Sequence, residues 1–544
     1  MYNPDSQTVQ EDGEGLPTYH STETNHIQNE KHTSLLQWMK EFGVFLLLIV
    51  IAILRGFSYA NLLPPWAIID EEQHLHYIQV LSEEGHRPDP SEDYLSSEII
   101  TSLFETQRWD TFGFTTPPSQ DPRDMGLEGY SYEGYQPPLY YLIMLPVYRL
   151  IGSAILQSLF NLRWATVVLS TLTVVFTYLL AAKVTGSKRL GLLATLVLLT
   201  IPERTVAVSR VNNDGLLELF AVLYLWLAVR SIMEEPSDWR SVLLGLLLGL
   251  GVMSKMTMTL LVFTLPFVFW PSRKTYSVRR GLILSLGSAA VLIIPLIIYN
   301  TGKYGDPTGF ASVSPLLLFP APAISLVNLL ESLVDLFSHF WVIFWQAAQA
   351  AIHPSFTALY GMLFLLWSVS LIGLTRELRD RGGNEESHRR VIALWMLITA
   401  VLIYTLFTLF SYWRGLVPIL QGRFLLPVTS AIAILLVLGL RRAPFPAFTI
   451  PALIFGLLLL DAFSLFGHLL PQYYPVDVIP QLDQIPRPPW FTTMILLIQR
   501  AGSFKPALVS QTLHATIAGY ILAQSLIIGL AIYSVRNWLR RGTV

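Results

Sequence analysis

Cysteine is absent from the 544 residues of this chain. Disulfide bonds, thiolate nucleophiles and cysteine metal sites are therefore excluded. Charge is also scarce, because Asp, Glu, Lys and Arg make up 14% of the chain, against about 25% in soluble domains. No stretch concentrates basic residues into a patch, which argues against a nucleic-acid-binding protein.

The chain is instead rich in long hydrophobic runs. Apolar residues make up 52% of the chain, the mean hydropathy is +0.49, and runs of about 20 apolar residues, enough to cross a bilayer, recur from residue 42 to residue 535. The sequence therefore predicts an all-α polytopic membrane protein with about twelve transmembrane helices. The predicted spans are 42–63, 164–182, 190–209, 215–233, 241–254, 256–270, 281–299, 357–375, 391–411, 424–440, 447–469 and 513–535. Residues 1–40 are mostly polar and are predicted to be a disordered cytoplasmic tail.

The basic residues predict the orientation of these spans. Twelve spans place both termini on one side, and the short loops of that side carry Lys188-Arg189, Arg273-Lys274 and Arg279-Arg280. Short cytoplasmic loops are enriched in Lys and Arg. We therefore expect cytoplasmic termini in a plasma or inner membrane. Residues 241–270 are predicted to form a hairpin with Lys255 at its outer turn, because one long helix would put the Arg273 region outside.

The loop after the first span is strongly acidic. Residues 64–136 hold 15 of the 38 Asp and Glu residues of the chain, against three Arg and no Lys. The run Asp70-Glu71-Glu72 opens this loop, directly at the predicted outer membrane edge. The later run 138–151 is too short to span and is expected to be an interfacial or re-entrant helix. Acidic residues at this position indicate a chemical site at the membrane surface.

Other unusual polar residues fall on the same predicted face. They are Arg55, Tyr135, Gln136, Arg163, Asn213, Asp214, Lys255 and Arg423. Charges at membrane depth are costly, so they usually pair or line a polar cavity. Carboxylates mixed with several cations suggest an acid–base group beside an anion site, such as one for a lipid phosphate.

Each of these residues also has a purely structural interpretation. Asp70 and Asp214 could be N-caps, and Glu71 could complement a helix dipole. Arg163 could reach to the headgroups, and Arg423 could be an interfacial anchor. His74 and His76 are predicted to be surface residues, since two histidines among acids are weak evidence for a metal site.

Several short motifs together resemble the GT-C superfamily of membrane glycosyltransferases. The resemblance is to the branch of protein O-mannosyltransferases and aminoarabinose transferases, and residues 40–310 carry most of it. Arg55-Gly56 followed by Asp70-Glu71 resembles the opening motif of that family. The motifs that follow in the expected order are Gln136-Pro137-Pro138-Leu139-Tyr140, Arg163, Asn213-Asp214, Ser254-Lys255 and Gln421-Gly422-Arg423-Phe424-Leu425-Leu426-Pro427.

The resemblance implies that a sugar moves, with inversion, from a polyprenyl-phosphate donor to an acceptor at the extracytoplasmic face. Asp70 would be the general base, with Glu71 beside it as a second catalytic carboxylate. The implied donor-phosphate ligands are Lys255, Arg163, Arg423 and Arg55. The implied substrate-lining residues are Tyr135, Gln136, Asn213 and Asp214. No cofactor is required, but Gln136 stands where the family has Lys or His, and the acidic run leaves a divalent metal open.

The expected organisation is a catalytic module and a C-terminal module. The first covers 41–310 and includes the outer loop 64–162. The second covers 311–544, with outer segments 311–356 and 470–512. Three alternatives stay open: a transporter or flippase of a lipid-linked or anionic substrate, a ligase that transfers a preassembled glycan, and an inactive relative. Transporters usually place charges at the midplane and show repeat symmetry, which this sequence does not. The sugar, the acceptor, the lipid length and the oligomeric state are not predicted.

Overall fold

The structure is a computed structural model. It describes residues 22–66, 70–90, 92–109, 115–151, 154–313, 319–323, 325–341, 354–379, 384–417, 420–443, 445–470 and 500–541. Contacts divide the chain into two units, 1–48 and 49–544, and each is considered by itself. In the first unit, helix α1 (Thr22–Leu62) begins within the segment predicted to be a disordered tail. Residues 1–21 of that tail lie outside the described residues.

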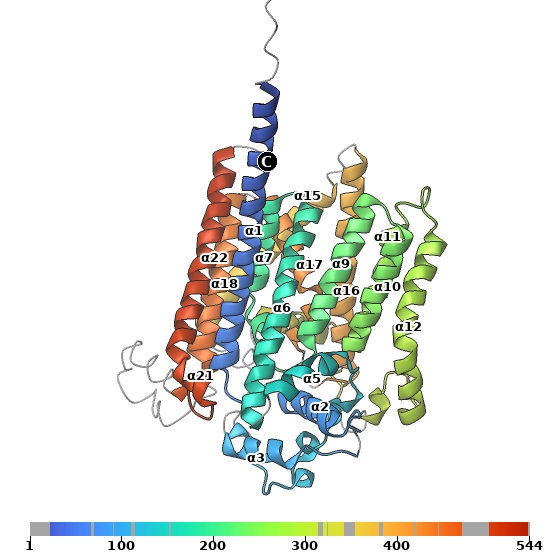
Figure 1. The fold of residues 1–544 in the computed structure, drawn as a ribbon, viewed down its shortest axis with the longest axis vertical. Helices are drawn as coiled ribbons and strands as arrows, with labels where there is room; N and C mark the ends of the chain where they lie inside the picture. The colour runs from blue at the N-terminus through green and yellow to red at the C-terminus, as the bar shows by residue number, and fades with distance from the viewer. Residues whose placement is uncertain are drawn as a thin grey trace, which may run out of the picture. The chain divides into compact units, whose positions relative to one another are not determined.

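Helices account for the regular structure of the described residues, as predicted (Figure 1). The described part holds no strand beyond a single bridge between Tyr94 and Tyr130. After α1, the elements are α2 (Glu71–Glu83), α3 (Ser97–Glu105), η1 (Pro122–Gly129), η2 (Tyr132–Tyr135), α5 (Leu139–Ile151), α6 (Ile155–Thr185), α7 (Lys188–Leu199), α8 (Pro202–Ala207), α9 (Asp214–Glu234), α10 (Asp238–Ser254), η3 (Met256–Thr264), α11 (Leu265–Phe269), α12 (Val278–Tyr304), η4 (Phe310–Ser312), α13 (Leu326–Trp341), α15 (Pro354–Arg379), α16 (Glu385–Trp413), η5 (Gly422–Val428), α17 (Thr429–Arg441), α18 (Pro446–Ala462), η6 (Phe463–Leu469), α21 (Ala507–Gln511) and α22 (Leu513–Arg541).

Nine helices in the described part of the chain are long and apolar enough to cross a membrane. They establish a multi-pass membrane protein, but they do not confirm the predicted number of twelve. Each predicted span has a helical counterpart, and the difference arises from short or broken helices. The span predicted at 190–209 is two helices, because Pro202 starts α8 and cannot continue α7. The spans at 241–254 and 256–270 correspond to α10, which has 17 residues, and to η3 with α11.

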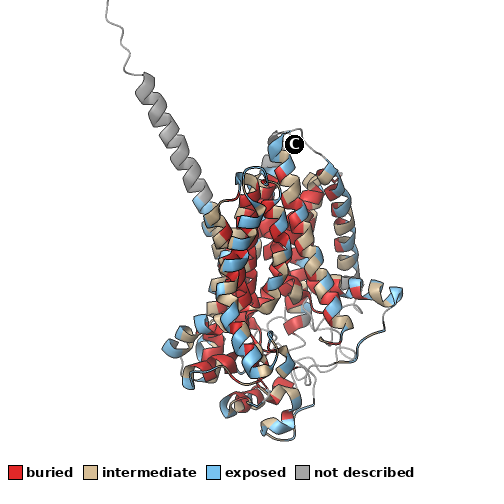
Figure 2. Cartoon of the chain, turned by 90° about the vertical axis from the view of Figure 1, so that its right-hand side faces the viewer, coloured by how far each residue is buried: buried red, intermediate tan, exposed pale blue. Residues whose placement is uncertain are grey.

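Small residues allow the helices to pack closely. A Cβ atom added to Gly245 on α10 would lie 1.9 Å from the carbonyl oxygen of Ser285 on α12. A Cβ atom on Gly439 of α17 would lie 2.1 Å from the carbonyl oxygen of Ser370 on α15. Close backbone approach through small residues is typical of helix pairs in membranes. Buried residues accordingly run through the interior of the bundle (Figure 2).

The segment between α1 and α6 folds into short helices at one end of the bundle. This end carries α2, α3 and α5, and it lies opposite the end where α22 finishes (Figure 1). α5 packs on α2, where the rings of Tyr77 and Tyr141 stack with centroids 3.6 Å apart and an interplanar angle of 6°. The long first loop with short helices is therefore as predicted. We call this the loop end of the bundle.

The predicted turn at Lys255 is present. α10 ends at Ser254, and Lys255 is extended, with φ −156° and ψ 132°. η3 then packs back on α10, since a Cβ atom on Gly251 would lie 2.4 Å from the side chain of Met258. The turn places Lys255 beside the start of α9, where Asn213 donates a hydrogen bond to the carbonyl of Ser254 at 3.2 Å.

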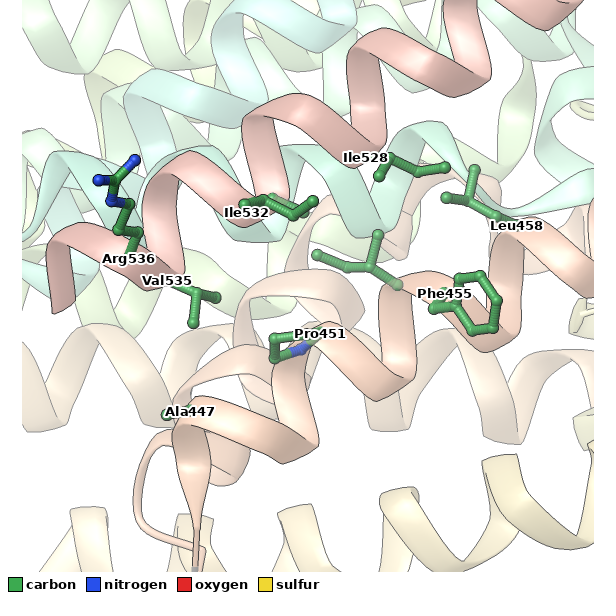
Figure 3. A pocket seen from close by; sticks show the side chains of 10 residues that line it. Ala447, Pro451, Phe455, Leu458, Ile528, Ile532, Val535 and Arg536 are labelled. Carbon is green, nitrogen blue, oxygen red and sulfur yellow. The ribbon is translucent and has the colours of Figure 1, made fainter. Parts of the chain in front are cut away.

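An apolar groove runs between α18 and α22 (Figure 3). Its volume is about 730 Å³, and it is lined by aliphatic side chains and Phe455, with Arg536 at one end. None of the predicted site residues lines this groove. The candidate site is therefore built elsewhere, at the loop end.

Candidate functional site

Asp70 joins parts of the chain that are far apart in sequence. It directly precedes α2 in a left-handed conformation, with φ 77°, and its side chain makes no capping bond. Instead, Asp70 Oδ1 accepts a hydrogen bond from Tyr132 Oη at 2.5 Å. Asp70 Oδ2 accepts one from Arg423 Nη2 at 2.8 Å. The carboxylate is thus turned away from the helix backbone, which argues against the simple N-cap interpretation.

Asp214 forms a second ion pair. It is the first residue of α9, and its Oδ1 lies 2.6 Å from Lys255 Nζ. Arg210 Nη2 lies 3.7 Å from the other oxygen of the same carboxylate. The capping bond at this helix start comes from Asn212, whose Oδ1 accepts the backbone N–H of Asp214. The carboxylate of Asp214 is therefore directed at cations rather than at the helix.

The two ion pairs form one polar cluster at the loop end. Burial by itself would raise the pKa of Asp70, but the charge of Arg423 and the hydrogen bond from Tyr132 hold that pKa below its usual value, with a smaller contribution from Arg210. Asp70 is therefore ionised at neutral pH. Beside the ion pairs Asp70–Arg423 and Asp214–Lys255, the cluster holds a third cation, Arg210, 3.7 Å from Asp214. The cluster therefore has one cation more than it has ion-paired carboxylates.

The predicted substrate-lining residues also meet in this cluster. Gln136 Nε2 donates to Tyr135 Oη at 3.0 Å, and Asn213 Nδ2 donates to Gln136 Oε1 at 3.2 Å. Arg87 fastens the same segment, because its Nη2 donates to the carbonyls of Gly134, Tyr135 and Gln136. The structure thus brings Tyr135, Gln136, Asn213 and Asp214 together; that they line a substrate stays a prediction.

Glu71 and Arg163 lie apart from the ion pairs of this cluster and form a fully buried ion pair of their own. Arg163 Nε and Nη2 donate to Glu71 at 2.8 and 2.5 Å. The remaining N–H groups of Arg163 donate to the carbonyls of Ala60, Leu63 and Pro64 at the end of α1. All five guanidinium donors are in use. The structure therefore does not support Arg163 as a phosphate ligand or Glu71 as a catalytic group, and it favours a positioning role for both.

Arg55 likewise forms its ion pair outside this cluster. Its guanidinium makes two hydrogen bonds to Asp461 on α18, at 3.0 and 2.7 Å. Tyr59 and Tyr520 donate to the same carboxylate, each at 2.6 Å. Arg55 and Asp461 are fully buried, so the pair holds α1, α18 and α22 together. The structure therefore does not support Arg55 as a ligand of the donor phosphate. The only sequence signal for its contact with Asp461 was a single acid inside a predicted span.

The prediction of surface histidines is wrong. His74 and His76 are both 4% exposed. Burial lowers the pKa of His74 to about 3, although Asp70 counteracts this, and burial lowers the pKa of His76 to about 4. His74 Nδ1 is hydrogen-bonded to Tyr141 Oη, and His76 Nδ1 to Ser131 Oγ. Among the described residues, no group of three or more metal-ligating side chains converges on one point.

Sequence reasoning missed three members of the cluster: Tyr132, Glu133 and Arg210. Tyr132 and Glu133 immediately precede the Tyr135-Gln136 motif, so their nearness to the motif was an available signal. Burial, followed by the charge of Asp70, raises the pKa of Glu133 to about 7, while Lys255 and Arg423 act against the rise. Arg210 precedes Asp214 by four residues, but it was hidden next to a predicted span.

Comparisons with known proteins agree with these motifs. Residues 135–299 match the family model described as dolichyl-phosphate-mannose-protein mannosyltransferase. No curated protein sequence matches the chain.

The chain is similar to several solved structures at low sequence identity. The chain is 15% identical to ArnT from Cupriavidus metallidurans bound to undecaprenyl phosphate, over 91% of this chain and 78% of that one, with a TM-score of 0.49. It is 15% identical to the Archaeoglobus fulgidus oligosaccharyltransferase complex with Zn and sulfate, over 77% of this chain and 53% of that one, with a TM-score of 0.44. For the arabinosyltransferase EmbB from Mycobacterium smegmatis, identity is 14%, coverage is 87% of this chain and 40% of that one, and the TM-score is 0.37.

The family match covers the part of the chain that supplies most of the cluster. Gln136, Asn213, Asp214 and Lys255 all fall within residues 135–299. The match also lies within residues 40–310, which carry most of the resemblance found in the sequence, and it is to a family of protein mannosyltransferases.

Proposed function

We propose that this protein transfers a sugar from a polyprenyl-phosphate donor to an acceptor hydroxyl at the extracytoplasmic membrane face. The observation that carries the proposal is the pairing of Asp70 with Arg423 and of Asp214 with Lys255 in one buried polar cluster. The matched family model, which is described by a dolichyl-phosphate donor, supports the donor class. No step of the proposal requires a cofactor.

Lys255 and Arg423 are the proposed ligands of the donor phosphate. Both side chains are 14% exposed, so part of each can be reached from the loop end. The Nε atom of Arg423 is buried and has no hydrogen-bond partner among the described residues. Preorganised cations in a site with little water stabilise the charge that develops on a departing phosphate. Arg210 adds a third positive charge to the site.

Asp70 is the proposed general base. The acceptor oxygen attacks the anomeric carbon as its proton moves to the Asp70 carboxylate. The bond between the anomeric carbon and the phosphate oxygen breaks, and its electron pair stays on the lipid phosphate. A single displacement of this kind inverts the anomeric centre. Tyr135, Gln136 and Asn213 are proposed to line the acceptor side, because they form one hydrogen-bonded row beside Asp214.

Sugar transfer tests the proposal. The purified protein is reconstituted in liposomes with radiolabelled polyprenyl-phosphate sugars and a membrane extract that supplies acceptors. The wild type is expected to move label from at least one carrier to an acceptor, and Asp70→Asn is expected to lose this activity by about 100-fold or more. Movement of the labelled lipid across the bilayer without transfer would instead indicate a flippase.

A further inference from the structure

Glu133 is a carboxylate in the cluster that the proposed mechanism does not use. It lies in η2, one residue after Tyr132, which donates to Asp70, and three before Gln136, which bonds to Asn213. Its carboxylate is hydrogen-bonded to the side chain of Gln136, but its Oε2 atom is buried and has no hydrogen-bond partner in the described part of the chain. A buried carboxylate oxygen without a partner is costly for folding, so its presence beside a proposed acid–base site calls for a functional explanation.

Three charged groups from three different elements act on Glu133. Asp70 faces it from the start of α2, Lys255 from the end of α10 and Arg423 from η5. The tyrosines whose own titration it influences are Tyr132, Tyr135 and Tyr141. Glu133 and Asp70 therefore share one set of cations, but Arg423 makes its direct ion pair with Asp70 alone.

We propose that the Glu133 carboxylate receives the proton that Asp70 removes from the acceptor hydroxyl. Glu133 acts through Asp70 and is therefore a positioning residue. This inference rests on the proposed function. Two carboxylates whose environments separate their proton affinities are a recurring acid–base arrangement. Asp70, paired with Arg423, is the weaker base of the two and returns quickly to its ionised form. Glu133, without such a pair, is the better resting place for the proton.

The atoms balance along this route. The acceptor O–H bond breaks, a bond forms between the acceptor oxygen and the anomeric carbon, and the phosphate oxygen leaves with its electron pair. The proton passes from Asp70 to the Glu133 carboxylate and later leaves to solvent. While Glu133 is protonated, the cluster holds three cations and two ionised carboxylates. This excess of positive charge is present while the released lipid phosphate carries its negative charge.

The test is the pH dependence of sugar transfer by the reconstituted full chain. Burial raises the pKa of Glu133 to about 7, so Glu133 can accept a proton only above that range. The wild-type rate is expected to rise with pH through a midpoint near 7 and then to level off. Glu133→Gln is expected to lose about 100-fold in rate and to lose the midpoint, while Glu133→Asp keeps a midpoint. Glu92→Gln, an exposed acid in the same loop, is the matched control.

The outcomes separate the two proposals. A wild-type profile that is flat between pH 6 and 8, or a Glu133→Gln variant that keeps the wild-type midpoint, would overturn the role of Glu133 and leave the transferase intact. A Glu133→Gln variant that does not fold still leaves the wild-type profile as a test. Absence of transfer from every donor would overturn the proposed function, and this inference with it.

Discussion

At the scale of residues, three consecutive acids have three different partners. Asp70 pairs with Arg423, Glu71 with Arg163 and Glu72 with Arg108. Successive residues at a helix start point in different directions, so each carboxylate meets a different part of the chain. The sequence could predict that this acidic run matters, but the division of roles depends on contacts with residues as far away as Arg423.

Arg163 tests this division of roles. We expect Arg163→Met to destabilise the protein by about 3–5 kcal/mol, because it leaves the charge of Glu71 buried without a partner. The unfolding of the detergent-purified protein measures this, with the exposed Arg376→Met as control. Unchanged stability together with weaker phosphate binding would instead restore the role that the sequence predicted for Arg163.

At the scale of elements, the site depends on short helices that periodicity cannot predict. η2 and η5 carry Tyr132, Glu133 and Arg423, and both are short 3-10 helices. The sequence located the Gln421-Gly422-Arg423 motif at a span end, and this position agrees with η5. It could not show that the backbone of α13 lies against Gly422, because residue 422 and residue 339 are brought together only by the tertiary fold.

Gly422 provides a prediction at this scale. A Cβ atom at this position would lie 2.1 Å from the carbonyl oxygen of His339 on α13, so Gly422→Ala must shift η5 or α13 and displace Arg423. Small displacements of a positioning group cost up to about 100-fold in rate, and we expect a loss of at least about 10-fold in sugar transfer. Gly361→Ala on α15 is the control, because among the described residues no atom outside its own stretch of helix backbone lies within 4 Å of the added Cβ. Equal activity of the two variants would show that η5 is not fixed by this contact.

At the scale of the whole molecule, the apolar runs predicted the fold class, whereas the predicted membrane orientation stays a prediction. The all-α membrane fold is confirmed, and each predicted span corresponds to helix in the structure. The number of crossings is not confirmed, because α10 is short and α7 ends before Pro202. The sequence could not predict the buried pair of Arg55 and Asp461, because the two residues are 406 positions apart.

The absence of cysteine makes the predicted orientation directly testable. Gln120 lies in the loop that is predicted to be outside, between α1 and α6, and Lys274 lies in the loop before α12; both are exposed. We expect a membrane-impermeant maleimide to label Gln120→Cys in intact cells and to label Lys274→Cys only after permeabilisation, because basic short loops stay cytoplasmic. The cysteine-free parent chain is the control for background labelling, and the reverse pattern would place the site on the cytoplasmic side.

The most direct test of the central claim is the binding of polyprenyl phosphate, the product that every donor of this class would release. Its affinity is measured for the reconstituted wild type, for Lys255→Met and for Lys274→Met, the control with an exposed lysine in the loop before α12. The account predicts saturable binding that weakens by about 10-fold or more in Lys255→Met, because a charge-assisted contact of about 1.5–3 kcal/mol is lost. It also predicts no change in Lys274→Met. Equal affinity of all three proteins, or no binding by the wild type, would contradict the claim that this cluster holds a lipid phosphate.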